Sequence, residues 1–183
     1  MSRRILFLVV SVVVLLGDQL SKLWAAATLK DSFGRVHDVE VIQNLLTLGY
    51  TVNRGIALGI LGDGGAATKW ILVVVSVGAA IFVAGYLFRA STSDKLLMAA
   101  LSLLLAGILG NLLDRVAYGY VIDFISFHYN EWQFPVFNLA DSAISVGAVL
   151  MAVDLLRSPK KSEEPAQVPQ PVAEHQVNLD ENV

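Results

Sequence analysis

The sequence contains no cysteine. Disulfide bonds, thiolate metal sites and a cysteine nucleophile are therefore excluded. Charged residues are also scarce, at 16% of the 183 residues, whereas soluble domains carry about 25%. The formal net charge is only −3, and no basic stripe of the kind that binds nucleic acid is present. We therefore expect no nucleic-acid partner, and most of the chain must face something other than water.

Apolar residues make up 55% of the chain and gather in long runs. A helix needs about 20 predominantly apolar residues to cross the hydrocarbon core of a bilayer. Four segments meet this requirement, at about residues 5–27, 70–88, 96–113 and 138–156. The sequence therefore predicts an all-α integral membrane protein, with a bundle of four transmembrane helices.

The first apolar segment has an alternative interpretation as a cleaved signal peptide. Arg3 and Arg4 form a basic start, and residues 25–27 are three alanines that resemble a cleavage site. Asp18 and Lys22 interrupt the approach to that site. We therefore favour a retained helix.

Lys and Arg indicate the orientation of the helices, since they are enriched on the cytoplasmic side. With both termini in the cytoplasm, that side receives Arg3, Arg4, Arg89, Lys95, Arg157, Lys160 and Lys161, against Lys30, Arg35, Arg54, Lys69 and Arg115 outside. Residues 28–69 then lie outside the membrane. Within them, residues 39–58 mix β-branched residues with Asn, Thr and Gly, which predicts a small extracytoplasmic sheet. Residues 158–183 are rich in Pro, Glu and Gln and are predicted to be a disordered cytoplasmic tail.

Ionisable residues inside a span cost at least about 2.5 kcal/mol on insertion scales, so each is a functional candidate. Asp18 and Lys22 lie one turn apart on the same face of the first helix. They form either an ion pair that holds the first helix against its neighbours or a direct contact with substrate, and the sequence leaves both interpretations open.

Two Asn-x-x-Asp pairs, Asn111 with Asp114 and Asn138 with Asp141, lie near the outer ends of the third and fourth spans. This spacing places both side chains of a pair on one helix face. Two helices thus bring an amide and a carboxylate to the same membrane depth. The alternative is that the pairs are helix caps or interhelical hydrogen bonds, and a cap explains Asn138 more easily than Asp141.

A third aspartate, Asp123, lies in an apolar stretch after Gly119, the predicted end of the third helix. Asp114 has the adjacent Arg115 as a possible partner, whereas Asp123 and Asp141 have no neighbouring cation. Carboxyl groups in apolar surroundings have raised pKa values, and two close together can share one proton. The residues therefore favour Asp123 with Asp141 as an acid–base pair.

Other catalytic patterns are weak or absent. The three histidines show no HExxH spacing, and no G-x-S-x-G is present. Ser21 and Lys22 are adjacent on a helix and point in different directions, which disfavours a serine–lysine pair. The rival functions are a small transporter, which would spread its carboxylates across the membrane depth, and a non-catalytic scaffold.

Five segments, in this order, resemble the motifs of lipoprotein signal peptidase, the type II signal peptidase of bacteria. They are Asp18-Gln19-Leu20-Ser21-Lys22, Asn53-Arg54-Gly55-Ile56-Ala57, Gly110-Asn111-Leu112-Leu113-Asp114-Arg115, Val121-Ile122-Asp123-Phe124 and Phe137-Asn138-Leu139-Ala140-Asp141. The resemblance covers about residues 5–156 and makes residues 1–157 a membrane peptidase domain.

The resemblance implies an aspartic endopeptidase of the bacterial inner membrane that needs neither metal nor cofactor. Its substrate would be a prolipoprotein whose cysteine already carries diacylglycerol, and membrane lipid would be its other partner; we expect a monomer. The implied catalytic pair is Asp123 and Asp141. The implied binding and supporting residues are Asp18, Lys22, Asn53, Gly55, Asn111, Asp114, Arg115 and Asn138. Residues 39–58 would form an outer cradle with a loop that acts as a lid.

Overall fold

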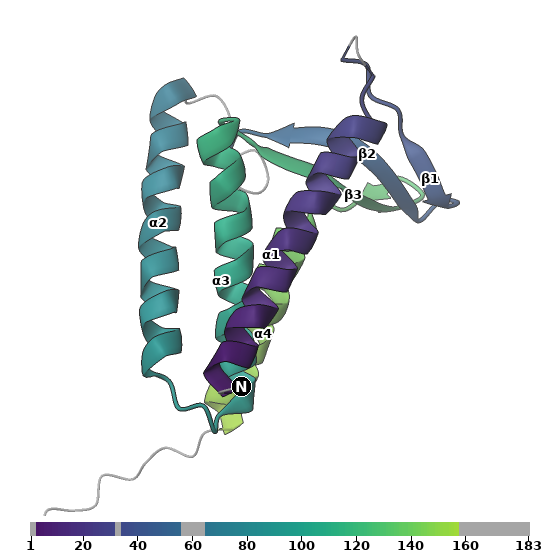
Figure 1. Cartoon of the computed structure of the whole chain (residues 1–183). Helices are drawn as coiled ribbons and strands as arrows, with labels where there is room; N and C mark the ends of the chain where they lie inside the picture. The colour runs from purple at the N-terminus through teal and green to yellow at the C-terminus, as the bar shows by residue number, and fades with distance from the viewer. Residues whose placement is uncertain (1–2, 32–33, 56–64, 158–183) are drawn as a thin grey trace, which may run out of the picture.

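A computed structural model describes residues 3–31, 34–55 and 65–157. Four helices and one sheet make up this part of the chain (Figure 1). The helices are α1 (Arg3–Thr28), α2 (Gly65–Arg89), α3 (Lys95–Ala117) and α4 (Leu139–Arg157). The strands are β1 (Val39–Ile42), β2 (Leu46–Asn53), β3 (Val121–Tyr129) and β4 (Trp132–Gln133). The predicted disordered tail lies outside the described residues.

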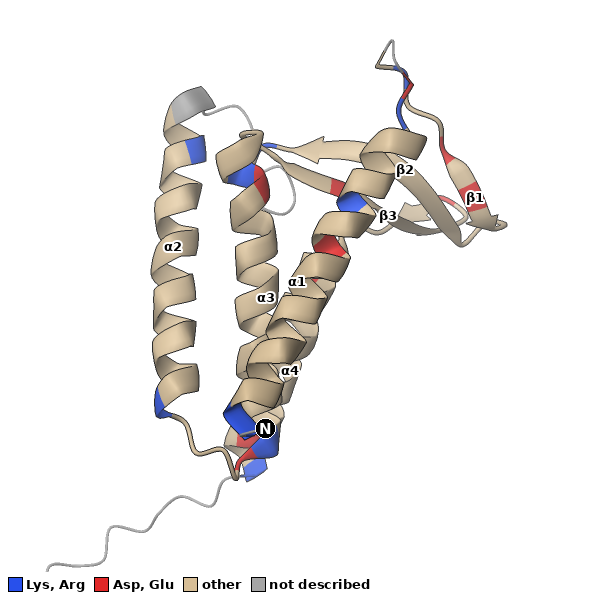
Figure 2. Cartoon of the chain, in the orientation of Figure 1, with Lys and Arg blue, Asp and Glu red and all other residues tan. Residues whose placement is uncertain are grey.

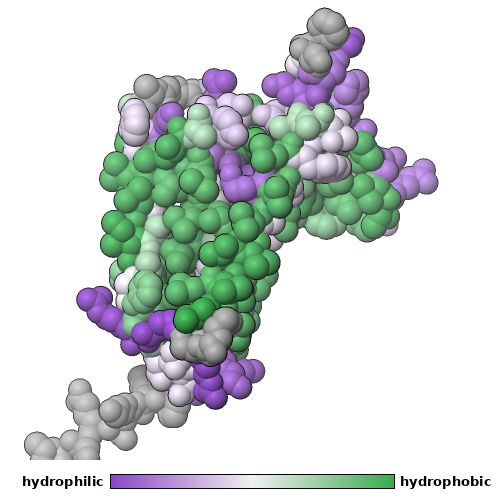
Figure 3. Space-filling model, viewed as in Figure 1, coloured by the Kyte–Doolittle hydropathy of each residue, from purple (hydrophilic) through white to green (hydrophobic). Residues whose placement is uncertain are grey.

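All four helices are long and apolar enough to cross a membrane. Hydrophobic side chains cover the helices, and hydrophilic side chains gather toward the two ends of the bundle (Figure 3). The four predicted spans are therefore confirmed, although two of their ends differ. α2 begins at Gly65 rather than near residue 70, and α3 continues to Ala117 rather than ending near residue 113. The polar residues at the end of α3 are buried against other elements, which allows the helix to continue through them.

Helix α3 is the most buried of the four and packs against the other three helices. Its contact with α4 depends on glycines. A Cβ at Gly107 would overlap the carbonyl oxygen of Ala140, and a Cβ at Gly147 would lie 2.9 Å from the carbonyl oxygen of Ala100. Larger side chains would push the backbones apart, so these glycines determine how closely α4 approaches α3.

The sheet is antiparallel with strand order β1-β2-β3-β4 and extends to one side of the helices at one end of the bundle (Figure 1). It packs on the end of α1 through the buried side chains of Ala25, Leu29, Tyr50, Ile122 and Phe124. The predicted small sheet is thus present, but half of its strands come from residues 121–133, for which we expected no strand. The run from Val121 to Phe124 is buried throughout. Without an alternation of apolar and polar residues, this run gave no strand signal.

Gly119 terminates the helical geometry just beyond α3, as predicted for this residue, because it has a φ of +83° and its N–H donates to the Arg115 carbonyl oxygen. At the other end of the bundle, the Arg4 guanidinium donates to the carbonyl oxygen of Ala90 at 3.0 Å. The start of α1, the turn between α2 and α3 and the end of α4 lie together there (Figure 1). The sheet and both helical Asn-x-x-Asp pairs lie at the opposite end.

Candidate active site

Lys22 is the centre of a buried ion-pair cluster between α1 and α3. Its ammonium nitrogen lies 2.8 Å from Asp18 Oδ2 and 3.0 Å from Asp114 Oδ2, and it donates to Asn111 Oδ1 at 3.1 Å. The Lys22 and Asp114 side chains are only 2% and 1% exposed. A buried charge is tolerated when it is paired and hydrogen-bonded, as here. These contacts favour the structural ion pair over a direct contact between Asp18 or Lys22 and substrate. Figure 2 shows charged residues on α1 and α3 toward the end that carries the sheet.

Asp114 ties α3 to the start of β3, because its Oδ2 also accepts a hydrogen bond from the Ile122 N–H at 3.1 Å. That contact holds the backbone immediately before Asp123. The expected partnership with Arg115 is absent among the hydrogen bonds and ion pairs of the described residues. Instead, Arg115 donates to the Gly55 carbonyl oxygen at 3.4 Å. Adjacent residues on a helix project about 100° apart, so Arg115 faces Gly55, just beyond β2, while Asp114 faces Lys22.

Asn138 and Asp141 form a reciprocal cap at the start of α4. The Asp141 N–H donates to Asn138 Oδ1 at 2.9 Å, and the Asn138 N–H donates to Asp141 Oδ2 at 3.3 Å. This is the geometry of a capping box, which satisfies two donors at a helix start. The helix-cap interpretation therefore holds for Asp141 as well as for Asn138. Asp18 joins them, since its Oδ1 accepts the Ala140 N–H at 2.8 Å.

Asp123 and Asp141 are joined through Asn138. The Asn138 amide donates to Asp123 Oδ1 at 2.7 Å, while its own backbone N–H contacts Asp141. Asn53 donates to Asp123 Oδ2 at 3.1 Å, and Asn111 donates to Asp141 Oδ1 at 2.7 Å. Each carboxyl group thus receives hydrogen bonds on both oxygens from asparagines or backbone. Unlike Asp18 and Asp114, neither forms an ion pair with the Lys22 ammonium.

The surroundings of Asp123 raise its pKa to about 6. Burial is the largest cause, since only 2% of the residue is exposed, and the nearby charge of Asp141 acts in the same direction. The hydrogen bonds from Asn53 and Asn138 and the charge of Lys22 oppose this rise. A carboxyl group with this pKa can release and take up a proton near neutral pH.

A family model described as "Signal peptidase (SPase) II" matches residues 10–157, which is most of the chain. The chain belongs to the signal peptidase II family. Its relatives include proteins named "Lipoprotein signal peptidase" from Burkholderia thailandensis and Paraburkholderia phytofirmans. Each is 43% identical over 148 residues, which is 81% of this chain and 86% or 83% of the relative. As a family member with four spans, the chain is a multi-pass peptidase of the bacterial inner membrane.

Two solved structures have the same fold. One, titled as a bacterial membrane enzyme structure at 2.3 Å resolution, has a TM-score of 0.72 and 30% identity, covering 86% of this chain and 92% of that one. The other, at 1.9 Å, has a TM-score of 0.72 and 29% identity over 84% and 94% of the two chains. The resemblance inferred from the five motifs is therefore confirmed.

The site also contains a residue that we did not predict, Gln19. Its side-chain amide lies 3.1 Å from Asp18 Oδ2, 3.1 Å from Asp114 Oδ1 and 3.2 Å from the Gly110 carbonyl oxygen. It therefore supports both carboxylates that pair with Lys22. A signal was available, since a glutamine amide within a span also needs a partner.

The motif at residues 53–57 is described by the structure as far as Gly55. Asn53 Oδ1 accepts the Gly55 N–H at 3.1 Å, which leaves the Asn53 amide free to donate to Asp123. The next motif residues, Ile56 and Ala57, and the end of the predicted cradle at residue 58 lie outside the described residues. Within residues 3–31, 34–55 and 65–157, no group of three His, Cys, Asp or Glu side chains is placed to hold a metal ion.

Proposed function

We propose that this protein is an aspartic endopeptidase that removes the signal peptide from diacylglyceryl-modified prolipoproteins, cutting before the lipidated cysteine. The observation that carries the proposal is the pair of carboxyl groups bridged by Asn138, one of which, Asp123, has a pKa of about 6. The substrate class follows from the family and from relatives named lipoprotein signal peptidase.

In the proposed reaction, Asp123 is protonated and Asp141 is ionised. Asp141 accepts a proton from a water molecule, whose oxygen attacks the scissile carbonyl carbon, while Asp123 donates its proton to the carbonyl oxygen. The tetrahedral intermediate then collapses. Asp141 gives its proton to the leaving nitrogen, and Asp123 recovers a proton from a hydroxyl group of the intermediate. Both carboxyl groups end as they began, and water has been added across the peptide bond.

The other site residues have supporting roles in this proposal. Asn53, Asn111 and Asn138 fix the carboxyl groups of Asp123 and Asp141 through hydrogen bonds. Asp18, Lys22 and Asp114 hold α1, α3, β3 and α4 together beneath them. Arg115, whose charge interacts with both Asp141 and Asp123, and Gly55, which accepts its hydrogen bond, would contact the substrate main chain or its glycerol region.

The site lies at the end of the spans rather than at the midplane, which suits a lipidated substrate. The diacylglyceryl chains would remain in the bilayer while the peptide bond reaches the carboxyl pair at the outer surface. We propose that this end is extracytoplasmic and that both termini are cytoplasmic. A monomer supplies every residue named in the mechanism.

The purified protein in lipid vesicles, incubated with a lipidated precursor, tests the proposal. Mass spectrometry of the product should show a cut immediately before the modified cysteine. The same precursor without diacylglycerol serves as the control and should be cut far more slowly. Asp123→Asn and Asp141→Asn should each abolish cleavage, and full activity of either purified variant would remove that residue from the catalytic pair.

A further inference from the structure

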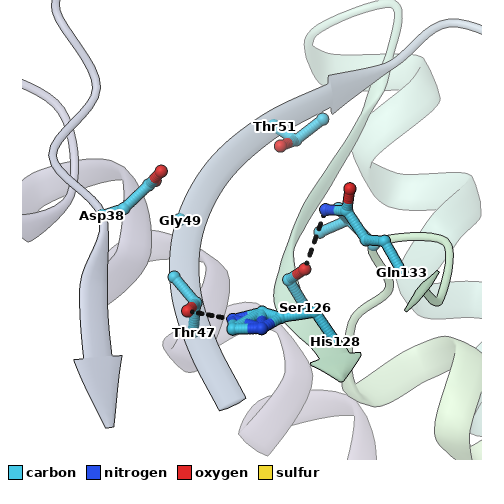
Figure 4. A pocket seen from close by; sticks show the side chains of 8 residues that line it. Asp38, Thr47, Gly49, Thr51, Ser126, His128 and Gln133 are labelled. Atoms are coloured by element: carbon cyan, nitrogen blue, oxygen red, sulfur yellow. Dashed lines mark hydrogen bonds between the residues drawn. The ribbon is translucent and has the colours of Figure 1, made fainter. Parts of the chain in front are cut away.

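The outer part of the sheet carries a polar cavity of about 250 Å³ that the mechanism above does not use (Figure 4). Its polar lining comes from β2, β3 and β4 and from the residue just before β1. The side chains are those of Asp38, Thr47, Thr51, Ser126, His128 and Gln133. A cavity with this lining suits hydrogen-bonding groups and disfavours acyl chains or apolar side chains.

Two pairs of lining side chains already contact each other. Thr47 Oγ1 lies 2.9 Å from His128 Nε2, and Gln133 donates to Ser126 Oγ at 3.2 Å. These contacts link adjacent strands and hold the walls in place. Each of these groups has a further donor or acceptor position for a ligand.

Asp38 is the exception among the lining side chains. None of the residues that the structure describes donates a hydrogen bond to its carboxylate or forms an ion pair with it. The carboxylate is brought over β2 because Gly49 has no side chain, and a Cβ there would overlap Asp38 Oδ1. The cavity thus contains one unpaired negative charge.

The cavity begins next to Asp123. Thr51, which lines it, lies directly across from Asp123 in the register of β2 and β3. Further along β3, Ser126 and His128 lie three and five residues after Asp123. At about 3.3 Å per residue, they are roughly 10 and 17 Å along the strand. An extended peptide cut at Asp123 would reach the cavity with about its third to fifth residue from the cut.

We propose that this cavity binds the third to fifth residues on the carboxyl side of the scissile bond, and that Asp38 selects against acidic residues there. The inference rests on the proposed function. The carboxyl side is the side that fits, because the signal-peptide side is an apolar segment that belongs in the bilayer. In the proposed reaction the segment after the cut leaves the membrane, and polar residues in it would match the lining of the cavity.

The test uses three lipidated precursors that differ only in having Ser, Lys or Asp at the fourth residue after the cut. With the wild-type protein, we expect kcat/KM for the Asp precursor to be about two- to fivefold lower than for the other two, the size of an exposed charge interaction. Asp38→Asn should remove this difference. Glu40→Gln is the matched control, since it removes the same charge from exposed β1 outside the cavity.

Equal kcat/KM values for the three precursors with the wild-type protein would overturn the inference while leaving the proposed function intact. A loss of discrimination in both variants would also overturn it, because the effect would then come from general surface charge. If the wild-type protein cuts none of the precursors, the proposed function itself fails.

A second measurement is independent of turnover. A photoreactive side chain at the fourth residue of the precursor, bound to the Asp141→Asn variant, should crosslink to β3 or to Gln133. Crosslinks confined to α2 would contradict the assignment.

Discussion

At the residue scale, the three aspartates near the site differ in their partners rather than in their type. Asp114 forms an ion pair with Lys22 and accepts hydrogen bonds on both oxygens, whereas Asp123 is buried with only amide donors. The sequence favoured Asp123 over Asp114 for a related reason, the adjacent Arg115. The cation that pairs with Asp114 is Lys22 rather than Arg115, and no sequence pattern showed that Lys22 contacts Asp114 from another helix.

The pKa of Asp123 predicts a pH dependence of cleavage. If Asp123 donates a proton, activity should fall as the pH rises above about 6, because the protonated fraction is lost. The hydrogen bond from Asn53 lowers this pKa. Asn53→Ala should therefore move the falling limb to higher pH, measured as kcat/KM across pH 5 to 9 with the lipidated precursor. A limb that stays in place or moves to lower pH would contradict the role of proton donor.

Replacing Asp114 and Asp123 one at a time should distinguish a residue that stabilises the fold from a residue that takes part in cleavage. Asp114→Asn removes one of the two carboxylates that pair with the buried Lys22 and should lower the free energy of unfolding by about 1 to 3 kcal/mol, with lost activity as a consequence. Asp123→Asn should abolish cleavage while thermal stability in detergent stays close to that of the wild type, because Asn has nearly the same size as the protonated carboxyl group and keeps an oxygen that accepts a hydrogen bond. Equal losses of stability in the two variants would show that the distinction is wrong.

At the element scale, the start of α4 combines a helix cap with a candidate catalytic group. Asn138 accepts the Asp141 N–H through its oxygen and donates to Asp123 through its amide. From the sequence, a helix cap and a catalytic role were alternative interpretations of Asn138 and Asp141. The structure contains the cap, and Asp141 still lies in the carboxyl pair. Strand β3, which carries Asp123, was not predicted because its first four residues are all buried and show no alternation.

Variants of Asn138 should distinguish its role as the cap of α4 from its role in positioning Asp123. Asn138→Ser keeps an oxygen that can cap α4 but loses the amide, so stability should fall little and cleavage should fall at least about tenfold. Asn138→Ala loses both and should also unfold more easily, by about 1 kcal/mol. Thermal unfolding in detergent and cleavage rates measure the two effects. Full activity of Asn138→Ser would show that the amide does not position Asp123.

At the scale of the whole molecule, the sequence predicted the four spans and the matched depth of the polar motifs, because length, hydropathy and span order determine them. It did not predict how closely α3 and α4 approach, which depends on backbone contacts at Gly107. Gly107→Ala should lower both stability, by about 1 to 3 kcal/mol, and activity, because it displaces α4 and with it Asp141. Gly78→Ala, with nothing within 4 Å of the added carbon, is the matched control and should have little effect.

The orientation across the membrane can be tested directly, since no native cysteine competes for labelling. Glu131→Cys lies in the turn between β3 and β4, and Ser93→Cys lies in the turn between α2 and α3 at the opposite end. A membrane-impermeant maleimide, applied to bacteria with a permeabilised outer membrane, should label Glu131→Cys and leave Ser93→Cys unlabelled. The reverse pattern would invert the proposed topology.

The bond between Asp18 and the Ala140 N–H joins residues 122 positions apart. During synthesis, α1 therefore enters the bilayer long before the ribosome has made the segment that completes its polar contacts. The two carboxyl groups proposed to cut substrate are likewise held together only after α4 has been inserted. A partly made chain would thus have no proteolytic activity until the last helix arrives.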